Sequence, residues 1–299
     1  MGKKLFWASA AAAAVVAASG YMLNVALSRK PTSQVDPPDT EEGRCINTWF
    51  AEGAKRVTHR TGDKQRLCAW FVPNANSRKY AVVCHGYGCS GKGMRHRAWH
   101  FYNMGFNILL PDARAHGGSS GEMIGMGWPE RRDIVDWIYE ILKRDKEAEI
   151  ILYGESMGAA TVMMTAGEVL PDNVKLAIED CGYTDVWDEL CYSIKSKYKL
   201  PAFPIIPVAS LLCKAKGGYR FRRASAVNQV KRCKIPMLFL HAENDRVVPY
   251  PMVFRLYAAA HCEKELVTFP DAGHCQCAES DPGLYWGSIK NFIEKYMNE

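Results

Sequence analysis

The chain has 299 residues, 48% of them hydrophobic, and a formal net charge of +6 at neutral pH. This length and apolar content predict one large domain with a sizeable core. Four basic residues lie within the first thirty positions, and the rest of the chain carries a charge of only about +2, which gives no basis for a nucleic-acid partner. The sequence contains no internal repeat, and its one low-complexity tract is an alanine-rich N-terminus.

The N-terminal segment has the composition of a membrane helix. Residues 5–27 are uncharged and lie between two basic pairs, at 3–4 and 29–30. This stretch has about the twenty residues that a helix needs to span a bilayer. A cleaved signal peptide is the alternative, because small residues occupy 17–20. We favour an uncleaved anchor over residues 1–30, since the apolar run continues beyond those small residues.

Residues 31–44 contain prolines and acids and predict a polar linker, so that residues 45–299 form the main domain. The basic residues are balanced between the two ends of the apolar stretch and indicate no orientation by themselves. The short basic N-terminal tail favours a cell-membrane protein whose main domain lies on the outer side. Eleven cysteines, an odd number, favour a reducing interior or an anaerobic habitat over a disulfide scaffold.

Six apolar runs predict strands, and segments with apolar residues at helical spacing alternate with them. This alternation is typical of βαβ units, with right-handed crossovers and a parallel sheet. The expected strands are 80–84, 106–110, 150–153, 174–179, 236–241 and 266–269, and the expected helices include 134–142, 252–260 and 285–296.

The stretch 154–158 reads Gly-Glu-Ser-Met-Gly and lies between the strand 150–153 and a helical segment. A strand, a G-x-S-x-G turn and a helix form a nucleophile elbow, in which the turn is so tight that side chains clash at the two glycine positions. The N-terminus of the helix that follows favours a developing oxyanion. We therefore predict that Ser156 is a nucleophile.

A serine nucleophile needs a base and an acid that orients the base. Asp245 follows the strand 236–241, and His274 lies on the loop after the next strand, 266–269. Both residues leave the carboxyl ends of strands, where ligand chemistry gathers in open parallel sheets. We predict Asp245 as the acid and His274 as the base; Glu243 and Asp180, which ends an earlier strand, are the rival acids.

The oxyanion hole needs two N–H donors. One donor is expected from the backbone of Met157, the residue after the nucleophile, and the other from the loop after an earlier strand. The sequence His85-Gly86-Tyr87-Gly88 follows the strand 80–84, so we predict the Tyr87 N–H as the second donor. We expect His85 to brace this loop.

One interval interrupts the alternation of strands and helices. About 184–229 separates two strands and is rich in apolar residues, with prolines at 201, 204 and 207. Long insertions inside compact domains are often lids. We predict a small, mostly helical cap over Ser156 that provides a hydrophobic acyl or aromatic pocket; a cap that only packs on the body is the alternative.

From about Cys68 onward, the chain resembles the α/β-hydrolase superfamily, in particular bacterial membrane-anchored serine hydrolases grouped with serine aminopeptidase-like and monoglyceride-lipase-like enzymes. The matching motifs follow in order: 85–88, 112–121, the Ser156 elbow, Asp245 and His274. The resemblance implies an α/β-hydrolase fold with a mostly parallel central sheet flanked by helices. The oxyanion loop lacks the proline of many proline iminopeptidases, which weakens a peptidase assignment.

Neither a metal nor an organic cofactor is expected. Cys275 and Cys277 form a lone C-x-C next to His274 without a second ligand pair. The predicted function is hydrolysis of a small carboxylic ester through an acyl-enzyme, with the membrane contacted through the N-terminal helix. Thioesterase or aminopeptidase activity on the same three residues is the alternative, as is a silent hydrolase fold that serves as a binding module.

Overall fold

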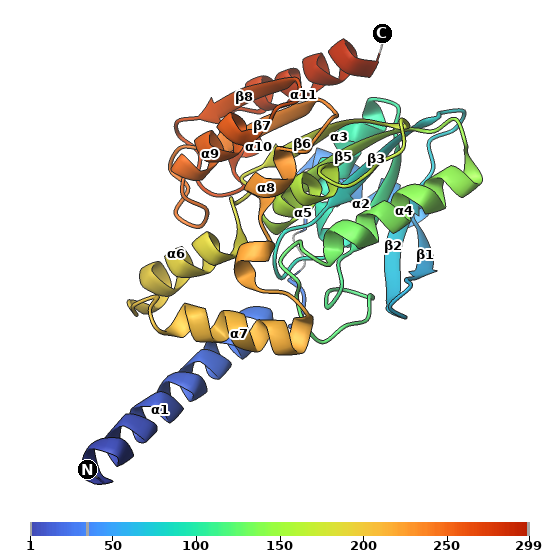
Figure 1. Ribbon diagram of the computed structural model, residues 1–299. Coiled ribbons are helices and arrows are strands. Elements are labelled where there is room, and N and C mark those ends of the chain that lie inside the picture. The colour runs from blue at the N-terminus through green and yellow to red at the C-terminus, as the bar shows by residue number, and fades with distance from the viewer. Residues whose placement is uncertain (1, 34–35, 298–299) are drawn as a thin grey trace.

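The computed structural model describes residues 2–33 and 36–297, which contain an eight-stranded sheet in the order β1-β2-β4-β3-β5-β6-β7-β8, flanked by helices (Figure 1). β2 runs antiparallel to β1 and β4, and the remaining neighbours are parallel. The predicted mostly parallel sheet is therefore confirmed. The strands are β1 (Lys55–Arg60), β2 (Arg66–Val72), β3 (Lys79–Cys84), β4 (Asn107–Asp112), β5 (Glu149–Glu155), β6 (Val174–Asp180), β7 (Met237–Ala242) and β8 (Lys264–Phe269).

Helices cover both faces of the sheet and divide the core into two layers. On one face, α2, α3, α10 and α11 contribute side chains such as Phe50, Phe101 and Phe292. On the other face, α4, α5, α8 and α9 contribute side chains such as Ile134 and Leu256. The bounds are α2 (Glu41–Gly53), η1 (Gly91–Met94), α3 (Arg95–Asn103), α4 (Glu130–Arg144), α5 (Met157–Ala166), α8 (Ala226–Val230), α9 (Pro251–Ala259), α10 (Cys277–Ser280) and α11 (Pro282–Met297).

The six predicted strands correspond to β3–β8. Four of them, β4–β7, are buried almost throughout, because helices cover both of their faces, and such strands read as continuous apolar runs. β1 lies at the sheet edge with mostly exposed side chains, and its sequence Lys-Arg-Val-Thr-His-Arg carries little apolar signal. α2 begins at Glu41, inside the segment expected to be a linker, with Thr40 as its N-cap.

The insertion after β6 is helical. It contains α6 (Val186–Tyr198), α7 (Ile205–Gly217), the short 3-10 helix η2 (Phe221–Arg223) and the start of α8. In Figure 1, α6 and α7 lie at the end of the sheet where β5, β6 and β7 terminate. The insertion therefore lies at the same end of the sheet as Ser156, which directly follows β5.

α1 (Gly2–Leu27) is one continuous helix that projects from the body (Figure 1). Within the described residues, it is the one helix long and apolar enough to cross a membrane, a property that signal sequences share. Its last turns pack against α7, and Ser19, Leu23 and Leu27 are buried there. The helix thus has an exposed N-terminal part and a C-terminal part embedded in the protein.

Candidate active site

Ser156 occupies the single position between β5 and α5, with φ 55° and ψ −114°. Few side chains adopt a positive φ, and residues held there often serve a function. A Cβ atom at Gly154 would collide with the backbone of Gly158, and one at Gly158 would collide with the carbonyl group of Cys84. The two glycines are therefore required by space, as the sequence predicted for an elbow.

The structure brings Ser156, His274 and Asp245 together in one chain of hydrogen bonds. His274 Nε2 lies 2.8 Å from Ser156 Oγ, and His274 Nδ1 lies 2.6 Å from Asp245 Oδ2. A carboxylate only accepts, so Nδ1 donates to it, and Nε2 of the neutral ring accepts the serine proton. Asp245 Oδ1 accepts from the backbone N–H groups of Val247 and Val248, each at 2.8 Å. These contacts hold the imidazole in the tautomer that a general base needs.

Two opposing influences act on the pKa of His274. Burial lowers the pKa of His274, but the hydrogen bond and the charge of Asp245 outweigh it, so the pKa lies above its ordinary value. The protonated form of the His274 ring is thereby stabilised.

The predicted oxyanion loop is braced by two histidines. His85 Nε2 accepts from the N–H of Ala113 at 2.9 Å, and its Nδ1 lies 2.7 Å from the Gly86 carbonyl oxygen. His116 Nε2 accepts from the Gly88 N–H at 3.1 Å. Both rings accept through Nε2, so both are neutral, and burial lowers the pKa of each. His85 has the bracing contacts expected for it, whereas sequence reasoning missed His116.

The predicted donors lie at suitable places for an oxyanion. Met157 is the first residue of α5, and the first N–H groups of a helix have no intrahelical acceptor. Gly86, next to Tyr87, approaches the nucleophile closely: a Cβ there would lie 3.5 Å from Ser156 Cβ. The loop and the helix N-terminus therefore flank Ser156.

Comparisons with known proteins find relatives over most of the chain. Residues 75–194 match the family model of the serine aminopeptidase S33 family. The Bacillus subtilis protein YqkD is 24% identical over 302 residues, which cover 99% of both chains. The uncharacterized membrane protein YNL320W of Saccharomyces cerevisiae is 24% identical over 80% of this chain and 79% of its own.

Solved structures share the fold. The Pyrococcus furiosus esterase Pf2001 superposes with a TM-score of 0.68 and 22% identity, covering 89% of this chain and 99% of its own. The match over residues 75–194 and the shared fold support a serine hydrolase with the α/β-hydrolase fold. The acylaminoacyl peptidase of Pyrococcus horikoshii also superposes, with a TM-score of 0.58 over 82% of the hydrolase and 41% of the peptidase.

A cavity of about 200 Å³ adjoins Ser156. Its walls are mostly apolar and come from α1, α6, α7 and the loops around the elbow. The lining residues include Leu23, Ala26, Met126, Leu190, Ile194, Ile206, Ala209, Phe221 and Val248. This composition agrees with the apolar pocket that was expected under the cap.

Glu189 of α6 is a buried carboxyl group in the wall of this cavity. Ser193 Oγ donates to its Oε1 at 2.9 Å, while Oε2 is buried and has no partner within the described residues. Burial raises the pKa of Glu189 to about 7. Sequence reasoning missed this acid. The sequence signal that could have found it is helical spacing: Glu189 follows the buried Val186 by three residues and so lies on the same, core-facing side of α6.

The two rival acids have other partners. Tyr285 donates to Asp180 at 2.7 Å, and Thr268 donates to Glu243 at 2.8 Å. Burial raises the pKa of Asp180 well above its ordinary value. Asp245, and neither rival, thus accepts from the His274 ring.

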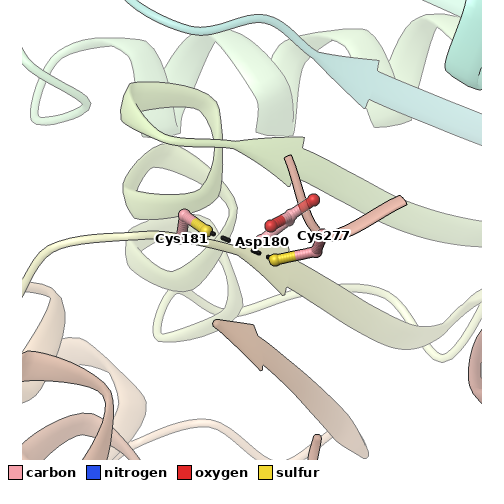
Figure 2. Close-up of side chains that lie close together, drawn as sticks. All are labelled: Asp180, Cys181 and Cys277. Atoms are coloured by element: carbon pink, nitrogen blue, oxygen red, sulfur yellow. Dashed lines mark hydrogen bonds between the residues drawn. The ribbon is translucent and has the colours of Figure 1, made fainter. Parts of the chain in front are cut away.

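Figure 2 shows Asp180, Cys181 and Cys277 close together; the sulfur atoms of the two cysteines lie 3.8 Å apart. Each residue offers one atom that could bind a metal ion, and these atoms lie within 4.8 Å of one another. All three residues are buried, and a metal ion would require deprotonated thiols. The hydrogen bond with Cys181 and burial both raise the pKa of Cys277, whereas hydrogen bonds with Cys275 and Cys277 lower the pKa of Cys181.

Proposed function

We propose that the hydrolase cleaves carboxylic esters with apolar acyl groups through an acyl-enzyme on Ser156. The observation that carries this proposal is the hydrogen-bonded chain from Ser156 to His274 and Asp245 beside an apolar cavity. Fold alone is shared by enzymes of many activities, so the proposal depends on the site.

In this mechanism, Ser156 Oγ attacks the ester carbonyl carbon while His274 Nε2 takes the hydroxyl proton. Asp245 keeps the ring oriented and stabilises the imidazolium. The N–H groups of Met157 and Tyr87 stabilise the oxyanion, a contribution of about 3 kcal/mol per donor in comparable sites. His274 then gives its proton to the leaving alkoxide. A water molecule, activated by the same imidazole, hydrolyses the acyl-enzyme and regenerates Ser156.

A fluorophosphonate probe tests the nucleophile, because it labels activated serines. We expect the full-length protein to be labelled and the Ser156→Ala variant to remain unlabelled. A series of p-nitrophenyl esters then measures the preferred acyl chain. A folded protein without labelling would contradict the proposal and favour a binding module.

Aminopeptidase activity is the second candidate, and Glu189 favours it. Glu189 lines the cavity, and its Oε2 has no partner among the residues that the structure describes, so this carboxylate is suited to bind the ammonium group of an N-terminal amino acid. Because an ionised Glu189 is needed for that contact, Glu189→Gln should lower the turnover of amino-acid p-nitroanilides relative to that of p-nitrophenyl esters, measured at a pH above the acid limb of the profile. Hydrolysis of the anilides at rates above those of the esters would favour the peptidase. A thioesterase assignment is tested by acyl-coenzyme A esters in the same series.

We further propose that α1 anchors the hydrolase in the cell membrane, with the body on the outer side. The length and apolar composition of α1 support an anchor, and the short basic N-terminal tail supports this orientation. The eleven free thiols favour the opposite side. Cys45 is exposed, so a membrane-impermeant maleimide distinguishes the two orientations. Labelling of Cys45 in intact cells supports the outer side, and labelling only after lysis contradicts it.

A further inference from the structure

The anchor helix forms part of the cavity wall. Met22, Leu23, Val25 and Ala26, on the last two turns of α1, line the cavity beside Ser156. The opposite walls come from α6 and α7 of the cap. A segment outside the main domain therefore contributes to the surface that an acyl chain would contact.

Hydrogen bonds tie this end of α1 to the predicted oxyanion loop. Tyr87 Oη donates to the carbonyl oxygen of Ala26 at 2.7 Å, and Lys30 Nζ donates to Tyr87 Oη at 2.8 Å. The N–H of Ser33 donates to the carbonyl oxygen of Gly88 at 2.7 Å. The helix end is thus held in one position relative to the elbow.

Arg29 adds a second tie, to the loop after β4. Its guanidinium group donates to the carbonyl oxygens of Gly117 and Ser119, at 2.9 Å and 2.8 Å. Leu27 is 1% exposed, and its carbonyl oxygen accepts from the N–H of Ile124. The junction is therefore tied to the body by hydrogen bonds and by a buried side chain.

The cap presents an apolar face next to α1. Exposed apolar side chains occur on α6, on α7 and on the segment between these helices, and exposed lysines lie near them in the sequence. The apolar residues are Tyr198, Leu200, Phe203 and Leu211, and the lysines are Lys195, Lys197, Lys199, Lys214 and Lys216. Apolar side chains with a basic rim are typical of surfaces that lie in the interface of an anionic bilayer.

The cavity and this face are continuous. Tyr198 belongs to both: it lines the cavity and is 47% exposed. The apolar window of α1, Ser9–Leu27, has 19 residues and is about 28 Å long at 1.5 Å per residue, close to the hydrocarbon thickness of about 30 Å. If the whole window spans the membrane, its last two turns lie at the boundary between hydrocarbon and headgroups. An acyl chain that leaves the cavity along α1 then enters the bilayer rather than water.

We propose that the substrate is an amphiphilic lipid ester of the same bilayer, whose acyl chain packs against the last two turns of α1. This inference rests on the proposed esterase function and extends it to a substrate class. It also makes Val25 a specificity-determining residue. Val25 lines the cavity but lies outside the buried core, so a change there alters the pocket with little effect on packing.

The proposed contact between the acyl chain and α1 is tested by measuring how turnover depends on acyl chain length, with the full-length protein in detergent. Val25→Trp should still be labelled by the fluorophosphonate, and its ratio of p-nitrophenyl palmitate to p-nitrophenyl butyrate turnover should fall by about tenfold or more, because buried methylenes each contribute about 0.8 kcal/mol. Asn24→Trp is the matched control, since Asn24 is exposed and lies outside the cavity wall. Val25→Ala should shift the optimum toward longer chains. Equal profiles for the two tryptophan variants would overturn the proposed wall.

Binding of a fluorescent fatty acid to the Ser156→Ala variant separates this proposal from the esterase function. Weaker binding with Val25→Trp added, but not with Asn24→Trp added, supports the wall even where the protein turns over no ester. Unchanged binding in both contradicts it.

The membrane route is tested in vesicles of phosphatidylcholine and phosphatidylglycerol. The protein should hydrolyse dioleoylglycerol in its own vesicles at least about tenfold faster than the same lipid in separate vesicles, since only the former shares the bilayer of α1. Equal rates would overturn delivery through the shared bilayer, while p-nitrophenyl butyrate turnover would still report an active esterase.

Discussion

Asp245→Asn is the sharpest test of the proposed mechanism, because the structure determines which way the new amide faces. Two N–H groups, of Val247 and Val248, point at the Oδ1 position from 2.8 Å. The asparagine oxygen must therefore occupy that position, and its NH₂ group faces His274 Nδ1. A donor there requires Nδ1 to be the acceptor, so the proton moves to Nε2. His274 can then no longer accept the proton of Ser156.

A wrong tautomer in such a triad lowers kcat by about 10⁴-fold, which corresponds to about 5 kcal/mol of transition-state stabilisation. The substitution is nearly isosteric, so the thermal unfolding temperature should change little. The assay is steady-state turnover of p-nitrophenyl butyrate beside the wild type. Asp180→Asn is the matched control, since Asp180 is the rival acid and bonds to Tyr285. An Asp245→Asn variant within tenfold of wild type, or an equal loss in the control, would refute the reasoning.

Three further predictions concern the elbow and the base. Ser156→Ala should abolish ester turnover and change the free energy of unfolding by no more than about 1 kcal/mol, the usual contribution of one hydrogen bond; denaturant titration measures the latter. Gly158→Ala should unfold the elbow, because its methyl group would collide with the carbonyl group of Cys84; circular dichroism and labelling would both report the loss, and a fully labelled variant would contradict it. The charge of Glu189 raises the pKa of His274, which must be neutral to act as a base, so Glu189→Gln should move the acid limb of kcat/KM to lower pH; an upward shift in the pH profile would contradict this sign.

Much of the fold could be predicted because buried parallel strands have a distinctive sequence. β4–β7 read as apolar runs, and the order of the elbow, Asp245 and His274 along the chain follows the order of the strand ends. β1 could not be predicted in this way, since an edge strand with exposed side chains needs no apolar alternation.

The pocket was harder to predict than the three hydrogen-bonded residues. An elbow is a local pattern, whereas the cavity wall combines α1 with a cap nearly two hundred residues later in the chain. Composition identified α1 as an apolar helix but contains no information about its packing partner. Glu189 was missed for a related reason: its neighbours Trp187 and Leu190 made α6 read as an apolar surface, and only the fold shows which side faces the cavity.

The two imidazole braces of the oxyanion loop have a consequence for acid tolerance. Burial, with a smaller effect of the neighbouring His85, lowers the pKa of His116 to about 4, so the folded state disfavours a proton that the unfolded chain accepts near its ordinary value of 6.5. Stability contributed by this ring is present above pH 6.5 and is lost as the pH falls toward 4. Protonation of Nε2 removes the acceptor of the Gly88 N–H. Acid should therefore inactivate the hydrolase in two stages: a reversible loss of the base as His274 is protonated, and then, at lower pH, a loosening of the loop that slows recovery after the pH is restored.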